Sequence, residues 1–102
     1  MTDSNPIALL VEDEPQIRRF VHSALEDEGW QVFESETMRR GLVDAGTRKP
    51  NLIILDLGLP DGDGVDFILD VRKWSTVPIA TSVNTRLIAP VMTILNMMSL
   101  MP

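Results

Sequence analysis

Three acidic side chains stand where short apolar runs of this sequence end. Glu12 and Asp13 follow the run 7–11, and Asp56 follows the run 52–55. Like charges about 4 Å apart repel by roughly 4 kcal/mol at an effective dielectric constant of about 20, unless a cation lies between them. Mg²⁺ is a hard cation that takes about six oxygen ligands, one or two of them protein carboxylates. The three carboxylates, if they converge, therefore predict a Mg²⁺ site.

Asp56 stands alone at the end of its apolar run, whereas Glu12 and Asp13 are neighbours. A carboxylate can attack phosphorus and form an aspartyl phosphate, so this spacing suits Asp56 as a nucleophile and the adjacent pair as metal ligands. A second interpretation stays open. In that interpretation Glu12 to Glu14 only interact with the dipole of a following helix, and Asp56 only caps a turn.

The elements that must position these acids follow from the hydrophobic pattern. Short apolar runs predict strands at residues 7–11, 31–34 and 52–55, and a further run opens at residue 77. Apolar residues at helical spacing predict helices at about 15–28, from Thr37 to before Pro50, and over 65–73. Such alternation indicates βαβ units and an α/β fold with a doubly wound parallel sheet. Ligands of such sheets bind beyond the carboxyl ends of the strands, where the three acids are expected.

Composition narrows the range of functions. The 102 residues include nine Lys and Arg against fifteen Asp and Glu, and the net charge of −6 disfavours direct binding to nucleic acid. There is no cysteine, which excludes disulfides, thiolate metal sites and a Cys nucleophile and favours a reducing compartment. No apolar stretch has the length of about 18 residues that a membrane span needs, and the first residues lack the features of a signal peptide. We expect a cytoplasmic location and no membrane contact.

The loop after the third apolar run carries the most specific motif. Residues 52–64 read Leu-Ile-Ile-Leu-Asp-Leu-Gly-Leu-Pro-Asp-Gly-Asp-Gly, and residues 9–14 read Leu-Leu-Val-Glu-Asp-Glu. In this order and at strand ends, the two motifs resemble the phosphoacceptor loop and the first acidic motif of bacterial response-regulator receiver domains. The resemblance covers residues 7–79 and extends to the regulators of a potassium-transport operon. It implies a flavodoxin-like, CheY-like fold.

That resemblance also implies a site, a cofactor and a partner. Asp56 would accept a phosphoryl group from a histidine of a sensor kinase. Mg²⁺ would be held by Glu12, Asp13, Asp56 and the backbone carbonyl of Gly58. The full-length regulator would act on transcription through a DNA-binding domain that is not in this chain. We therefore expect a phosphoacceptor domain rather than an enzyme, with at most self-phosphorylation and autodephosphorylation, and no direct contact with nucleic acid.

Two further features of receivers have to be sought in the second half of this sequence. Receivers carry a hydroxyl at the end of the fourth strand, and Thr81 or Ser82 would supply it here. They also carry a lysine at the end of a fifth strand, but the only lysines of this chain are Lys49 and Lys73, neither of which is at such a position. Two alternatives therefore stay open. One is a phosphorylation-incompetent fragment or self-associating interaction module, and the other is a Mg²⁺-dependent phosphohydrolase with an aspartate nucleophile.

The end of the chain has a composition of its own. Arg86 is the only charged residue from Ile79 to Pro102, so we expect a receiver core over residues 1–79 and an atypical apolar tail over 80–102. Codons allowed for residues 85–94 also permit a second reading frame that resembles the receiver segment before the fifth strand. A frameshift after about Ile79 is one hypothesis. A natural apolar helix that supports a homodimer or a domain swap is the other. In either case phosphorylation is not expected to drive the usual receiver dimerisation.

Overall fold

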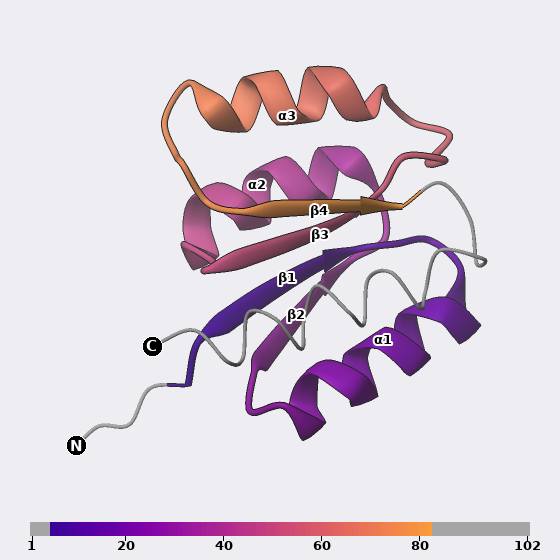
Figure 1. Ribbon diagram of the computed structural model, residues 1–102. Coiled ribbons are helices and arrows are strands. Elements are labelled where there is room, and N and C mark those ends of the chain that lie inside the picture. Colours follow the sequence, from indigo (N-terminus) through magenta and orange to yellow (C-terminus); the bar gives the residue numbers. More distant parts are fainter. Residues whose placement is uncertain (1–4, 83–102) are drawn as a thin grey trace.

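The computed structural model describes residues 5–82, in which strands and helices alternate (Figure 1). In chain order the elements are β1 (Ile7–Val11), α1 (Pro15–Asp27), β2 (Gln31–Ser35), α2 (Met38–Arg48), β3 (Leu52–Asp56), α3 (Gly64–Arg72) and β4 (Ile79–Ser82). All seven predicted elements are present, with bounds within about two residues of the expected ones. β4 includes residues 80–82, which the composition places in the apolar tail. The rest of that tail, residues 83–102, lies outside the described residues, and so do the expectations of a frameshift and of self-association that rest on it.

The four strands form one parallel sheet in the order β2-β1-β3-β4. The chain moves outward from the middle of the sheet in both directions, because β1 pairs with β2 on one side and with β3 on the other. The order therefore reverses between β1 and β3, and this is the place where ligands of open α/β sheets bind. The predicted α/β class with a doubly wound, flavodoxin-like sheet is confirmed.

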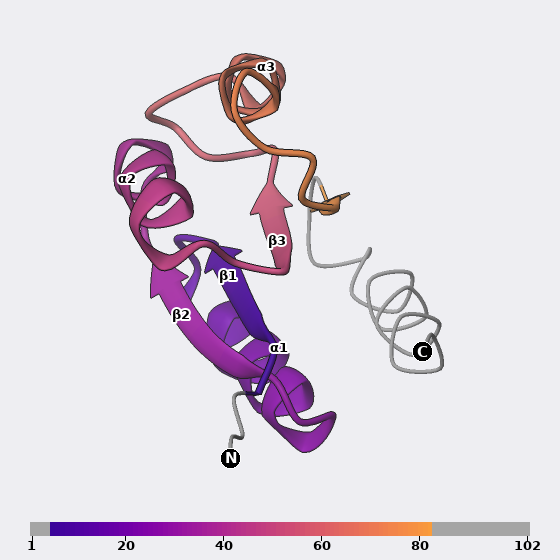
Figure 2. The same ribbon diagram turned by 90° about the vertical axis from the view of Figure 1, so that its left-hand side faces the viewer.

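Helices cover both faces of the sheet, with α1 on one face and α2 and α3 on the other (Figure 2). Successive strand residues point to opposite faces, so the core divides into two clusters. The cluster on the α1 face contains Ala8, Leu10, Val21, Leu25, Trp30, Leu52, Ile54 and Ala80. The cluster on the other face contains Leu9, Val11, Met38, Ala45, Ile53, Leu55, Leu59, Phe67, Val71 and Val77. β1 and residues 52–55 of β3 are apolar throughout because both faces of these strands are buried.

Each helix follows a strand end at the carboxyl edge of the sheet and begins with a side-chain cap, α3 after the loop of residues 57–63. Glu14, Thr37 and Asp63 accept hydrogen bonds from backbone N–H groups two or three residues further on, at 3.2, 3.1 and 2.8 Å. These caps satisfy N–H groups that a helix start otherwise leaves unpaired. Within residues 5–82, none of the helices has both the length and the apolar character that a membrane crossing requires.

The two glycines of α2 predict opposite effects of the same substitution. A Cβ atom at Gly41 would lie 3.0 and 3.1 Å from the two methyl groups of Val11 and 3.2 Å from the ring of Phe67, whereas one at Gly46 would meet nothing within 4 Å. Val11 and Phe67 are buried and cannot easily yield. We expect Gly41→Ala to lower the free energy of unfolding by about 1 kcal/mol or more through overpacking. Gly46→Ala should raise it by up to about 1 kcal/mol, because alanine favours a helix.

Urea unfolding of the two variants and the unchanged protein measures both effects. A shift of both variants in the same direction would contradict the close approach of α2 to β1.

Candidate metal centre at the carboxyl edge of the sheet

Three of the predicted site residues meet at the carboxyl edge of the sheet. The pairing of β1 with β3 places Val11 level with Leu55, so the next residues, Glu12 and Asp56, emerge side by side. Glu12, Asp13 and Asp56 each offer a carboxylate oxygen, and these oxygens all lie within 4.8 Å of one another. The convergence that the sequence predicts is thus present, at the point where the strand order reverses.

Glu12 lies in the most restricted position of the three acids. Its side chain belongs to a residue that is only 5% exposed, its backbone N–H donates to the carbonyl of Ser35 at 2.9 Å, and its Oε2 accepts the N–H of Glu14 at 3.1 Å. Burial, followed by the proximity of Asp56 and Asp13, raises the pKa of Glu12 to about 7, although the N–H of Glu14 acts in the opposite direction. Glu12 therefore keeps its proton to a higher pH than an ordinary glutamate unless a cation takes the place of that proton.

The donor set fits a hard divalent cation such as Mg²⁺. All three side chains offer oxygen, and neither histidine nor cysteine belongs to the cluster. The N–H of Gly58 donates to Oδ1 of Asp56 at 2.8 Å, and this bond closes a turn directly after β3. Asp56 thus does cap a turn, and it also belongs to the acidic cluster. Glu14, by contrast, only begins α1.

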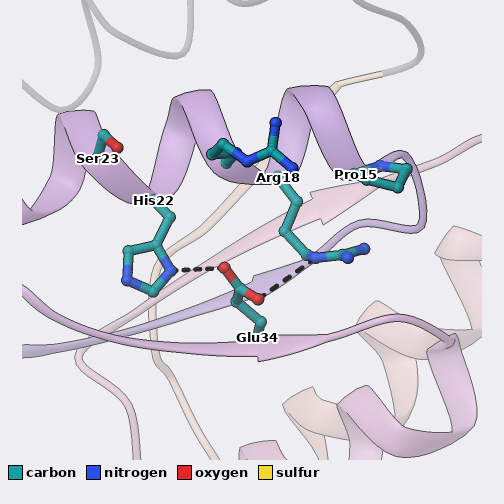
Figure 3. A pocket seen from close by; sticks show the side chains of 6 residues that line it. Pro15, Arg18, His22, Ser23 and Glu34 are labelled. Atoms are coloured by element: carbon teal, nitrogen blue, oxygen red, sulfur yellow. Dashed lines mark hydrogen bonds and ion pairs between the residues drawn. The ribbon is translucent and has the colours of Figure 1, made fainter.

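Arg18 of α1 supports the backbone of the acidic turn, a role that no pattern in the sequence indicates. Its Nη1 donates to the carbonyls of Glu12 and Asp13 at 3.1 and 3.4 Å. Its Nε pairs with Glu34 of β2 at 3.3 Å, and His22 contacts the other carboxylate oxygen of Glu34 (Figure 3). The guanidinium therefore holds the turn from the α1 side of the sheet. This contact of Arg18 could not be predicted from the sequence, because every residue has a backbone carbonyl and residue type therefore does not mark the acceptors.

The register of β4 bears on the two candidate hydroxyl residues. Ser82 pairs with Asp56 and Thr81 with Leu55, so the backbone of Ser82 is level with the expected phosphoacceptor. Lys49 and Lys73 follow the carboxyl ends of α2 and α3, which run back toward the amino edge of the sheet, and Lys73 pairs with Asp70 at 3.6 Å. Both lysines of the chain are therefore at the edge opposite the acidic cluster.

This fold, with an acidic cluster at its switch point, defines the class of response-regulator receiver domains. The sequence matches the response regulator receiver domain family over residues 8–95. The chain belongs to this family. The matched range extends beyond the described residues into the segment that the composition separates as a tail.

Two curated relatives are transcriptional regulatory proteins that share the name KdpE. The chain is 66% identical over 71 residues to the KDP operon transcriptional regulatory protein KdpE of Escherichia coli K12. It is 40% identical over 73 residues to the transcriptional regulatory protein KdpE of Mycobacterium tuberculosis H37Rv. These matches cover 70% and 72% of this chain and 32% of each relative, so the chain spans about a third of their length. The chain is therefore a receiver domain similar to that of KdpE.

Solved structures agree with this assignment. A sensor protein from Polaromonas sp. JS666 matches with a TM-score of 0.71 and 31% identity over 81% of this chain and 70% of that one. A CheY-like response regulator receiver domain from Methylobacillus flagellatus has a TM-score of 0.71 and 26% identity over 76% of this chain and 69% of that one. Both likenesses cover more than the acidic motifs, because they extend over most of the sheet and its helices.

The raised pKa of Glu12 predicts how pH changes stability. Because the folded-state value of about 7 exceeds the ordinary value of 4.5, ionisation of Glu12 opposes folding, and its contribution to stability falls as pH rises between these values. Glu12→Gln lacks this loss. Without divalent cations, the variant should be close to the unchanged protein near pH 5 and more stable by about 1 to 2 kcal/mol near pH 8.

Urea unfolding at the two pH values, with and without Mg²⁺, tests this expectation. Mg²⁺ should stabilise the unchanged protein at the higher pH and have little effect on the variant. Equal dependence of stability on pH in the two proteins would show that ionisation of Glu12 does not oppose folding.

Proposed function

We propose that this chain is the phosphoacceptor domain of a two-component regulator, with Asp56 as the residue that receives the phosphoryl group. The single observation that carries the proposal is the convergence of Glu12, Asp13 and Asp56 within 4.8 Å at the switch point of the sheet. Family membership supports it, because the motifs that hold these acids are the ones that resemble receivers. Mg²⁺ is the proposed cofactor, held by the three carboxylates and the backbone carbonyl of Gly58.

In the proposed reaction, one carboxylate oxygen of Asp56 forms a bond to phosphorus while the bond from phosphorus to the donor's leaving atom breaks. The leaving atom keeps the electron pair, and the product is an acyl phosphate. The N–H of Gly58 holds Oδ1, which orients the other oxygen, Oδ2, for attack. A bound Mg²⁺ would neutralise the negative charge that gathers among the phosphoryl oxygens and the three carboxylates.

Beyond this chain, the proposal concerns the whole regulator. A sensor histidine kinase is the proposed source of the phosphoryl group, and control of transcription through a separate DNA-binding domain is the proposed output, as for a KdpE-type regulator. A cytoplasmic location is proposed as well, because it suits both the phosphoryl source and the control of transcription. Thr81 or Ser82 is the proposed hydroxyl residue, because the pairing of β4 with β3 brings their backbones level with Leu55 and Asp56.

One observation favours the alternative of a receiver that binds Mg²⁺ without becoming phosphorylated. Lys49 and Lys73 are the only lysines, and both lie at the edge of the sheet opposite Asp56. The site therefore has no lysine to pair with the charge of a phosphoryl group. The acids that hold the cation are retained, so cation binding and phosphorylation can be separated by experiment.

Intact-mass measurement after incubation with Mg²⁺ and a small phosphodonor such as acetyl phosphate tests the proposal. We expect one added phosphoryl group on the unchanged protein and none on Asp56→Asn, because the amide is a far weaker nucleophile than the carboxylate. Chelation of Mg²⁺ should lower the yield by an order of magnitude or more.

The other outcomes identify the alternatives. No modification in a folded sample that binds Mg²⁺ would indicate the phosphorylation-incompetent receiver. Continued release of inorganic phosphate, many times over per chain and lost in Asp56→Asn, would indicate the phosphohydrolase.

A further inference from the structure

The loop between β3 and α3 is fastened to a helix far from it in the sequence. Oδ1 of Asp61 accepts the backbone N–H of Met38 at 2.9 Å, and Oδ2 accepts that of Arg39 at 3.1 Å. Both donors lie in the first turn of α2, more than 20 residues before Asp61. One carboxylate from the phosphoacceptor loop thus binds the start of α2 through both of its oxygens.

The start of α2 depends on this loop for half of its capping. A helix leaves its first four N–H groups without partners inside the helix. Thr37 satisfies one of them in α2, because its Oγ1 accepts from Arg40 at 3.1 Å, and the N–H of Gly41 makes the first bond within the helix, to the carbonyl of Thr37 at 2.9 Å. Asp61 satisfies two others, those of Met38 and Arg39. These backbone N–H groups lower the pKa of Asp61, so its carboxylate is ionised and favourably placed at the positive end of the helix dipole.

The segment from Gly58 to Asp61 has little freedom to absorb a displacement. Leu59 is 4% exposed and packs in the cluster under α2 and α3, and the ring of Pro60 restricts its φ angle. Gly62 lies so close to Met38 that a Cβ atom there would be 3.0 Å from the Met38 sulfur. A shift of Asp61 therefore passes to Gly58, whose N–H holds Oδ1 of Asp56.

We infer that Asp61 is a positioning residue for the metal and phosphoacceptor site, acting on Gly58 and Asp56 through the segment between them and tying that site to the start of α2. The inference rests on the proposed function, because it takes Mg²⁺ as the ligand of the site. Coupling between two sites is reciprocal, so Mg²⁺ binding must also stabilise the contacts of Asp61 with α2.

The first test measures Mg²⁺ affinity by titration, with amide NMR signals as the readout. Thr37→Ala is the matched control for Asp61→Ala. Both variants remove a cap from the same end of α2, but only Asp61→Ala releases the loop. We expect Asp61→Ala to weaken Mg²⁺ binding about tenfold, as is common when a residue that supports metal ligands is lost. Thr37→Ala should leave the affinity unchanged. Asp61→Asn keeps one acceptor of the same shape and should restore part of the affinity.

Loss of charge needs a control of its own. Asp66→Asn removes an exposed carboxylate from the first turn of α3 and should not change Mg²⁺ affinity. If it weakens binding as much as Asp61→Ala does, the effect is electrostatic and the inference is overturned. If Thr37→Ala and Asp61→Ala weaken Mg²⁺ binding equally, Asp61 acts only through the stability of α2, and the inference is also overturned.

Hydrogen exchange of the unchanged protein gives a second test that needs no variant to fold. Mg²⁺ should slow exchange at the amides of Met38 and Arg39, which Asp61 caps, more than at Arg40, which Thr37 caps, and at Gly41, whose N–H makes the first bond within the helix. Equal protection of the four amides would contradict the coupling. A wild-type protein that binds no Mg²⁺ at all would overturn the proposed function, and the inference with it, whereas binding that Asp61→Ala leaves intact overturns the inference alone.

Discussion

The parallel pairing of β1 with β3 is the constraint on which the rest of the site depends. Because Val11 is level with Leu55, the residues that follow each strand must share one small region at the edge of the sheet. Those residues are Glu12 and Asp56, and the sequence adds Asp13 beside them. The sheet cannot keep this register and separate the charges. The register of the two strands therefore concentrates negative charge at this edge.

The surroundings of the acids show how the fold tolerates that charge. Arg18 donates to the carbonyls of the acidic turn and so fixes its backbone without neutralising the carboxylates themselves. The N–H groups of Glu14 and Gly58 each hold one carboxylate oxygen. These bonds orient the ligands but do not offset the burial of Glu12 and the nearby charges, which together raise its pKa. A site that is strained without a cation and ordered in advance is well suited to bind one, since a bound cation removes the strain that the fold maintains.

The sequence predicts those parts of the structure that depend on local pattern or on a strand end. The apolar runs indicate the strands, Pro15 and Thr37 indicate helix starts, and acids at the ends of two runs indicate the metal centre. Contacts that join distant segments have no such signal. Asp61 is one of two acids in a turn-forming loop, and only the tertiary structure brings it to Met38 and Arg39. The pairing of Ser35 with the buried Asp44 at 2.7 Å, between β2 and α2, is hidden for the same reason.

The residues that could hold a cation and those that would contact a phosphoryl group come from different parts of the chain. Metal binding and phosphorylation, as proposed for this site, can therefore be lost separately. The carboxylates come from β1 and β3, whose pairing and buried faces are part of the core and persist as long as the sheet folds. In the proposed function, a group that pairs with the phosphoryl charge would have to come from outside β1 and β3, and neither lysine of the chain is at that edge. A change outside the two central strands would therefore alter that pairing and leave the three acids where they are. Residues 5–82 contain the three carboxylates that could hold a cation, and their convergence needs only the central strands and the residues that follow them.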